Sequence, residues 1–139
     1  MKIACIGGGA AGLYFAISMK LRDPAHEIEV IERTTPDNTF GWGVVFSDAT
    51  IQNLRDNDPE SAQKILDSFA HWDDIDVHFK GTTVTSGGHG FCGIARSRML
   101  DILQRRAVAL GILITYETEV ESLEPYLGFD LVVAADGIN

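Results

Sequence analysis

KIACIGGGAAGLYFAISMKLRDP, residues 2–24, followed by EIEVIE at residues 27–32, is the stretch that decides the fold of this chain. Lys2–Ile6 is an apolar run that predicts a short strand buried on both faces, as in a parallel sheet covered by helices. A glycine-rich break follows, and apolar residues then recur at helical spacing over Ala10–Arg22 until a proline ends the helix. The segment at 27–32 predicts a second strand. The order strand, glycine turn, helix, strand makes one βαβ unit.

The glycine turn has the spacing of a dinucleotide-binding fingerprint, because Gly7, Gly9 and Gly12 form G-x-G-x-x-G between a strand and a helix. The first glycine allows a tight turn, the second leaves room for a pyrophosphate, and the third lets the helix and strand pack closely. The helix N-terminus then offers N–H groups to the phosphates. Glu32 lies 20 residues after Gly12, near the spacing of an acid that accepts from a ribose hydroxyl and repels a 2′-phosphate. The alternative is a plain glycine-rich turn beside a solvated glutamate.

Composition indicates one globular domain and excludes several partners. The chain has 139 residues, 45% of them hydrophobic, and a net charge of −9. That charge repels nucleic acids and anionic membrane surfaces, so we expect neither as a partner. The opening apolar run is too short for a signal-peptide core, and a membrane span would need about 20 apolar residues, so we expect a cytoplasmic protein. Cys5 and Cys92 have no metal-ligand spacing, and Cys5 is expected to be a small buried core residue.

The rest of the chain departs from a minimal NAD-binding domain, which would continue with further βαβ units. Ser47 or Asp48 is expected to cap a helix, Asp58 to open another, and Gly111 to end a third in a left-handed conformation. An inserted segment is expected at about residues 58–95. The expected elements are a loop at 36–48, helices at 48–57, from 58 to about 69 and at 98–110, an antiparallel pair at 76–79 and 82–85, and strands at 112–115, 120–123 and 130–134.

Four separated motifs resemble the single-component FAD-dependent aromatic hydroxylases, the family that includes 4-hydroxybenzoate hydroxylase. They are GGGAAGLYFA, VIER, the helix that starts with Arg96-x-x-Met99-x-x-x-Leu103, and VVAADG. The runs GWGVVFSDAT, FAHWDDIDVHFKG and TSGGHGF most resemble the flavin domains of the salicylyl-CoA 5-hydroxylases and 2-aminobenzoyl-CoA monooxygenases. The hydroxylases of violacein synthesis are more distant. The resemblance covers the whole chain and implies an α/β, Rossmann-like (GR2-type) FAD-binding domain, with a parallel sheet, helices and a small antiparallel insertion, incomplete at its C-terminus.

The resemblance also implies roles for particular residues. Gly7, Gly9, Ala10, Ala11 and Gly12 would face the FAD pyrophosphate or form its turn. Glu32 would bind the adenosine ribose, and Arg33 would lie near the adenosine half. The remaining implied residues are Arg96 for the pyrophosphate or ribityl oxygens, Asp136 for FAD and nicotinamide binding, and Gly43, Val44 and Val45 along the flavin. Each of these roles has a structural alternative. Arg96 could be a surface arginine at a helix start, Asp136 a turn aspartate, and Gly43–Val45 part of a packed loop.

The function implied is flavin-dependent hydroxylation of an aromatic substrate, possibly an aromatic acyl-CoA, with NAD(P)H as co-substrate and O2. No residue is assigned as catalytic, which suits an enzyme whose cofactor does the chemistry. The histidines, His26, His71, His78 and His89, are expected on the surface or satisfied, although His89 and Phe91 lie where a substrate could approach. A second FAD motif and a substrate domain are expected beyond Asn139. Alternatives are another FAD oxidoreductase of this fold and a truncated, non-catalytic nucleotide-binding module.

Overall fold

A computed structural model describes residues 1–36, 38–39 and 41–137. The chain divides into two compact units, one made of Met1–Phe40 with Ser97–Asn139 and the other of Gly41–Arg96. The second unit is wider than the inserted segment expected at 58–95. Each unit is described by itself below.

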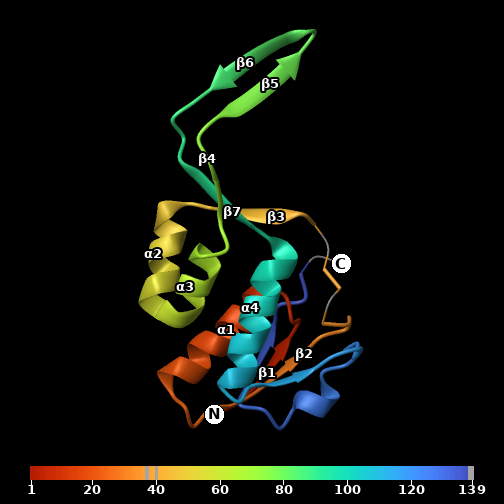
Figure 1. Cartoon of the computed structure of the whole chain (residues 1–139). Coiled ribbons are helices and arrows are strands. Elements are labelled where there is room, and N and C mark those ends of the chain that lie inside the picture. Colours follow the sequence, from red (N-terminus) through yellow and green to blue (C-terminus); the bar gives the residue numbers. More distant parts are fainter. Residues whose placement is uncertain (37, 40, 138–139) are drawn as a thin grey trace. The chain divides into compact units, whose positions relative to one another are not determined.

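The first unit is built on a parallel sheet with the strand order β8-β2-β1-β9 (Figure 1). Its strands are β1 (Lys2–Ile6), β2 (Glu27–Ile31), β8 (Leu113–Thr115) and β9 (Leu131–Ala134). In chain order this is third, second, first, fourth, which is the first part of the doubly wound Rossmann arrangement. The α/β fold with a parallel sheet is therefore confirmed. Because the chain goes from β1 to β2 on one side and reaches β9 on the other, the sheet has a topological switch point at β1.

Two helices contribute to the core of this unit. Helix α1 (Ala10–Arg22) packs against β1 and β2, and its Leu13 and Ile17 are fully buried. Helix α4 (Arg96–Ala109) is followed by Gly111, whose φ of +77° gives the expected left-handed stop. The strands bury side chains on both faces, as the apolar sequence of β1 predicts. The buried residues of the strands and of α4 include Ile3, Cys5, Val30, Ile31, Met99, Leu100, Ile102 and Leu103.

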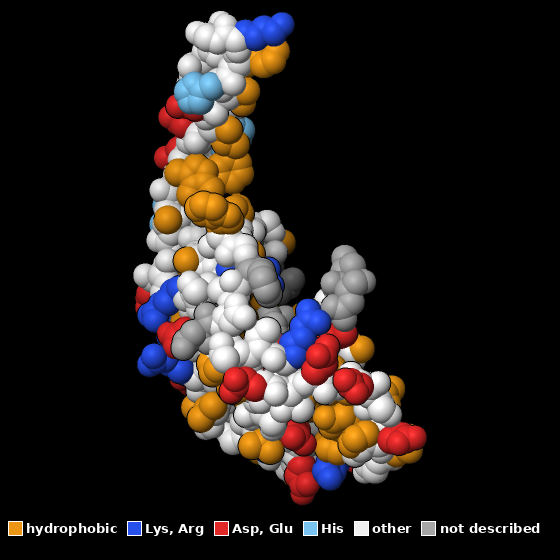
Figure 2. Space-filling model, turned by 90° about the vertical axis from the view of Figure 1, so that its right-hand side faces the viewer, with side chains coloured by type: hydrophobic (Ala, Val, Ile, Leu, Met, Phe, Trp, Pro, Cys, Tyr) orange, Lys and Arg blue, Asp and Glu red, His pale blue; other side chains and the backbone are white. Residues whose placement is uncertain are grey.

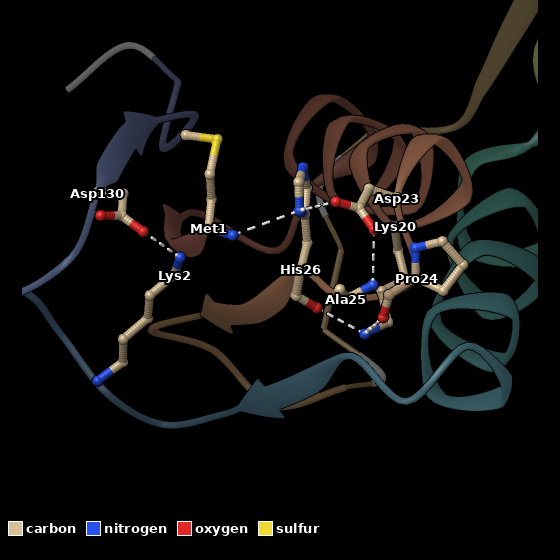
Figure 3. Close-up of polar contacts among 8 residues, drawn as sticks. All are labelled: Met1, Lys2, Lys20, Asp23, Pro24, Ala25, His26 and Asp130. Atoms are coloured by element: carbon tan, nitrogen blue, oxygen red, sulfur yellow. Dashed lines mark hydrogen bonds and ion pairs between the residues drawn. The ribbon is translucent and has the colours of Figure 1, made fainter.

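Polar contacts fix the amino-terminal edge of the same sheet, where β1 begins (Figure 3). The Nδ1 atom of His26 lies 3.5 Å from the amino group of Met1 and 3.4 Å from the carboxylate of Asp23. The backbone N–H of Lys2 donates to Asp130 Oδ2 at 2.6 Å. His26 is 8% exposed and has these partners, so the expectation of a satisfied histidine is confirmed.

The second unit contains two helices and five strands within Gly41–Arg96. Its three-stranded antiparallel sheet has the order β3-β7-β4, and β5 and β6 form a separate hairpin. Ser47 caps α2 by accepting from the backbone N–H of Thr50 at 3.3 Å, and Pro59 begins α3. The elements are β3 (Gly43–Phe46), α2 (Asp48–Asn57), α3 (Pro59–Leu66), β4 (Ala70–Trp72), β5 (Ile75–Phe79), β6 (Thr82–Ser86) and β7 (Phe91–Ala95).

The hairpin has one apolar and one polar face. Val77 pairs with Val84 across the two strands, and both are more than half exposed, as is Phe79. On the other face Thr85 Oγ1 donates to Asp76 Oδ1 at 2.6 Å. Figure 2 shows hydrophobic side chains gathered along this segment. The alternation predicted for an antiparallel pair is confirmed.

Three predictions about elements were wrong, and two further strands were missed. The loop expected at 36–48 contains β3, although positions 37 and 40 lie outside the described residues. Strands β4 and β7 were not foreseen. Residues 120–123 are irregular chain before a 3-10 turn at Glu124–Tyr126, because this segment pairs with no strand among the described residues and Val120 is its one β-branched residue. The helix after Asp58 ends at Leu66, so Phe69 lies before β4 instead of in a helix.

Within the described part of the chain, no helix has both the length and the apolar character that crossing a bilayer requires.

Candidate functional site

The carboxyl ends of β1, β2 and β9 meet at Gly7. The backbone N–H of Gly7 donates to the carbonyl of Ile31 at 2.7 Å, and that of Ala135 donates to the carbonyl of Ile6 at 2.7 Å. Gly7 has a φ of +108°, and a Cβ there would lie 2.4 Å from the Ala135 carbonyl oxygen. Only glycine fits such a turn. In open α/β sheets, ligands bind beyond the carboxyl ends of strands at this switch point.

Gly12 and Gly9 differ in what surrounds them. A Cβ on Gly12 would lie 2.0 Å from the Gly7 carbonyl oxygen and 3.2 Å from the Cys5 sulfur, so α1 packs directly on the turn. A Cβ on Gly9 would meet nothing within 4 Å. The third glycine of the fingerprint therefore serves packing, whereas the second faces open space.

The N-terminus of α1 opens beside Gly9. Gly9 is the N-cap residue and provides no side-chain cap, and the backbone N–H of Leu13 makes the first intrahelical bond, to the Gly9 carbonyl at 3.0 Å. The N–H groups of Ala10, Ala11 and Gly12 precede that bond, so they lack intrahelical acceptors. Such a helix end attracts an anion through its N–H groups and its dipole.

Glu32 follows β2, and its carboxylate turns toward the glycine turn. Oε2 accepts a hydrogen bond from the Gly8 N–H at 2.7 Å, and Oε1 accepts from the N–H and the hydroxyl of Thr34 at 2.8 and 2.9 Å. A carboxylate has about four lone-pair positions, so these three donors leave Oε2 with room for one more. The Glu32 carboxylate is thus held in place and can still accept one further hydrogen bond.

The surroundings of Glu32 favour its charged form. Partial burial acts to raise the pKa of Glu32, but hydrogen bonds from Thr34 and Gly8 and the charge of Arg33 act against it. The net effect is a pKa below the ordinary value of 4.5. Glu32 is therefore an anion at neutral pH, and Arg33, an exposed residue, balances part of that charge.

Asp136 follows β9 and Ala135, in the turn that contacts Gly7. Its backbone nitrogen is 2.7 Å from the position that a Cβ on Gly7 would take. The Asp136 side chain is exposed, and Gly137 follows with a φ of +84°. Gly7, Gly9, Gly12, Glu32 and Asp136 therefore come together at one edge of the parallel sheet.

The other predicted site residues belong to the second unit. Gly43, Val44 and Val45 form most of β3, and a Cβ on Gly43 would lie 2.9 Å from the Ile94 carbonyl oxygen. Arg96 is the first residue of α4, and its backbone N–H donates to the Trp42 carbonyl at 3.2 Å. The buried Nε of Arg96 has no hydrogen-bond partner among the residues that the structure describes. A buried donor without an acceptor is costly in a native protein, so this atom calls for an explanation.

Thr34 is a site residue that the sequence analysis missed. It supplies two of the three hydrogen bonds that hold the Glu32 carboxylate. A signal existed, because a threonine two residues from an acid often pairs with it locally.

Comparisons with known proteins relate the chain to aromatic monooxygenases. It is 43% identical over 139 residues to a salicyloyl-CoA 5-hydroxylase of a Streptomyces species. It is 34% identical over 138 residues to the 3-hydroxy-4-methyl-anthranilyl-[aryl-carrier protein] 5-monooxygenase of Streptosporangium sibiricum. These matches cover 100% and 99% of this chain but only 27% and 38% of the two relatives. No protein-family model matches the chain.

A solved structure has the same fold. The tetrameric form of 2-methyl-3-hydroxypyridine-5-carboxylic acid oxygenase superposes with a TM-score of 0.81 at 23% identity, over 98% of this chain and 39% of that one. The arrangement of strands and helices described above is therefore one that an oxygenase uses.

Proposed function

Because this chain is homologous along its whole length to aromatic monooxygenases, we propose that it is the FAD-binding part of a flavin-dependent enzyme that hydroxylates an aromatic substrate. The observation that carries the proposal is the open space over Gly9 at the N-terminus of α1, with the anchored Glu32 carboxylate beside it. The chain spans about a quarter to two fifths of its curated relatives, so the activity proposed is that of a whole enzyme.

The glycine turn fits a dinucleotide pyrophosphate. Gly9 leaves the approach to the backbone open, and the first-turn N–H groups of Ala10 and Ala11 are free of intrahelical bonds. Close packing at Gly7 and Gly12 keeps the helix end fixed at the strand end. Phosphate oxygens would therefore bind a helix end whose geometry does not depend on the ligand.

Glu32 fits the adenosine ribose. It is ionised, held by Gly8 and Thr34, and keeps one acceptor position on Oε2 for a ribose hydroxyl. The same charge disfavours a 2′-phosphate, so FAD suits this position and NADP does not. Arg33 would lie near the adenosine half of the cofactor.

The family resemblance implies further cofactor contacts by Arg96, Gly43–Val45 and Asp136. Arg96 carries a buried Nε without an acceptor, and a pyrophosphate or ribityl oxygen would supply one. Val44 and Val45, with the side-chain-free Gly43, would lie along the flavin ring. Asp136, at the end of β9, would serve FAD and nicotinamide binding.

The cofactor supplies the redox chemistry and the protein supplies position and shelter. When bound, the flavin would take electrons from NAD(P)H and activate O2 so that one oxygen atom enters the ring. The substrate class follows the relatives, one of which is named for a CoA thioester and another for an aryl-carrier protein. We propose an aromatic acyl thioester and a cytoplasmic enzyme, and we assign no catalytic residue within this chain.

Titration with FAD tests the proposal. Gly9→Val adds a side chain in the proposed phosphate path, whereas Gly128→Val is a matched control because a Cβ on Gly128 also meets nothing within 4 Å. Quenching of flavin fluorescence should saturate with the unchanged chain and with Gly128→Val, and should be lost with Gly9→Val. Equal FAD binding by all three proteins would contradict a phosphate site at Gly9.

Two alternatives predict different results. A non-catalytic module would bind FAD with no turnover in the whole protein, and a different FAD oxidoreductase would oxidise NAD(P)H without hydroxylating an aromatic ring. Product analysis after oxygen uptake distinguishes the three.

A further inference from the structure

One face of the β3-β7-β4 sheet carries a row of aromatic rings. Trp72 of β4 and Phe91 of β7 are cross-strand partners, so their side chains stand on the same face. Their rings stack with centroids 5.7 Å apart and an interplanar angle of 25°. The ring of His89 continues the row, 5.1 Å from that of Phe91. We call Trp72, Phe91 and His89 the aromatic row.

Gly93 fixes how the indole lies. A Cβ on Gly93 would be 3.1 Å from Cη2 of Trp72, so the indole occupies the space that a side chain at this position would take. Gly93 itself is buried. The Trp72 ring is thus supported from below by the backbone of β7, and its orientation is set by the sheet.

His89 is held at the other end of the row. Its backbone N–H donates to the Asp73 carbonyl at 3.1 Å, and its Nε2 lies 2.7 Å from the hydroxyl of Ser86. Both contacts come from within the same unit. The three rings therefore form a surface whose arrangement is fixed by contacts within this unit.

The two faces of this sheet are covered differently. The opposite face has its own aromatic packing, since the Phe46 and Phe69 rings lie 5.4 Å apart, and Ile94 there is 4% exposed. On the face of the aromatic row, Trp72 is 38% exposed and Val45 is 57% exposed. Val45 is the register partner of Gly93, so the row continues directly into β3.

We propose that the aromatic row binds the planar ring of the substrate in an uncharged acyl form. The inference rests on the proposed function, in which Gly43, Val44 and Val45 of β3 contact the flavin, because Val45 lies on the same face of the sheet as the row. Offset or tilted stacking on Trp72 and Phe91 suits a flat aromatic group.

Charge favours an acyl derivative over a free acid. Asp73 and Asp74 directly follow Trp72 and are exposed, and Asp74 Oδ1 lies 2.7 Å from the position of a Cβ on Gly87. These two carboxylates repel an anionic substituent on a ring bound beside them. A thioester or an amide has no such charge.

Nuclear magnetic resonance on the chain labelled with nitrogen-15 tests the inference. The chain has two tryptophans, and Trp42, which is 98% exposed, serves as an internal control whose indole signal Trp42→Phe identifies. Titration with salicylamide, a neutral aromatic amide, should move the Trp72 indole signal saturably and leave that of Trp42 in place. Salicylate should bind more weakly than salicylamide.

Matched variants locate the contact. Phe91→Leu should weaken salicylamide binding roughly two- to tenfold, as expected for the loss of one aromatic contact, while Phe79→Leu on the hairpin should not change it. His89→Gln, at an exposed position, provides a second variant of the row whose folding is not at issue.

An unmoved Trp72 signal, parallel shifts of both indoles, or tighter binding of salicylate would overturn the inference. FAD titration of the same samples is read separately. Retained FAD binding with an unchanged Trp72 signal contradicts only the proposal that the aromatic row binds the substrate ring. Absent FAD binding contradicts the proposed function.

Discussion

The backbone N–H of Gly8 donates a 2.7 Å hydrogen bond to Glu32 Oε2 and so joins the glycine turn after β1 to the end of β2. Two halves of the predicted nucleotide site, a bare turn and an acid, are thereby one hydrogen-bonded structure. A ligand that binds one of them is positioned by the other, which is the basis of the first two predictions.

Replacing Glu32 should weaken FAD binding. Glu32→Gln removes the charge and puts an amide NH2 where Gly8 or Thr34 now donates, so FAD affinity should fall about tenfold or more, as for other hydrogen bonds to charged groups. Glu29→Gln is the control, because Glu29 lies on the same strand and accepts from Thr115 Oγ1 at 3.2 Å, away from the carboxyl edge. Binding isotherms should separate the two variants. Equal affinities would remove Glu32 from the site.

The stability of the chain should depend on Glu32 in acid. Because the pKa of Glu32 is lower in the folded chain than its ordinary value of 4.5, the unfolded state takes up the proton more readily. The stabilisation is complete above about pH 5 to 6 and is lost as the pH falls through 4.5 and toward the folded pKa. Urea unfolding can be measured at several values from about pH 6 down to about pH 3. Over this range the free energy of unfolding should fall less for Glu32→Gln than for the unchanged chain. Parallel curves would contradict the shift.

Substituting Gly12 should destabilise the fold although the residue lies in a helix. Alanine in place of a helical glycine would ordinarily stabilise by about 0.5–1 kcal/mol. Here its Cβ would lie 2.0 Å from the Gly7 carbonyl oxygen, and a backbone atom in a tight turn cannot move aside cheaply. Overpacking of this kind costs about 1–3 kcal/mol or more. Gly128→Ala should change the unfolding free energy by less than about 0.5 kcal/mol.

Arg96 should matter for the cofactor more than for the fold. Arg96→Gln removes the buried Nε that has no partner among the described residues, so thermal stability without FAD should be unchanged or higher. FAD affinity should fall about tenfold or more, because a charged donor to a phosphate or ribityl oxygen is lost. Arg98→Gln, two residues further along α4, is the control, since Arg98 pairs with Asp101 at 3.0 Å. A stability loss with unchanged FAD affinity would assign Arg96 a structural role.

Cys5 should be unreactive in the folded chain. Burial raises the pKa of the Cys5 thiol to about 11, so roughly one part in a thousand is thiolate at pH 8. In a Cys92→Ser background, Ellman's reagent should modify Cys5 only after denaturant is added. Rapid modification of the folded chain would show that β1 is not buried as described.

Local patterns predicted the first βαβ unit almost residue by residue. The bounds of β1 and α1 were those expected, because a buried apolar run, helical periodicity and a terminating proline all act within a few residues of each other. The short strands β3, β4 and β7 were missed for the opposite reason. Gly93 in β7 is unremarkable as a single residue, and it belongs to a strand because Trp72 lies over it and Val45 pairs with it.

The same distinction holds for the candidate site. Spacing alone placed Glu32 one strand after the fingerprint, but the hydrogen bonds that hold its carboxylate, above all those from Thr34, appear only once the turn is folded. The strand wrongly predicted at 120–123 makes the same point, since a short segment becomes a strand only when a partner edge is available.

By itself, the sequence determined the glycine turn, the helix that follows it and the acid at the end of the second strand, since each depends on neighbours close along the chain. Only the tertiary structure decided that β9 lies next to β1, so that the backbone of Ala135 and Asp136 lies against Gly7 at the carboxyl edge of the sheet. That contact joins residues more than 100 positions apart. Local propensity carries no information about such pairing, because it depends on which strands can bury their two faces together.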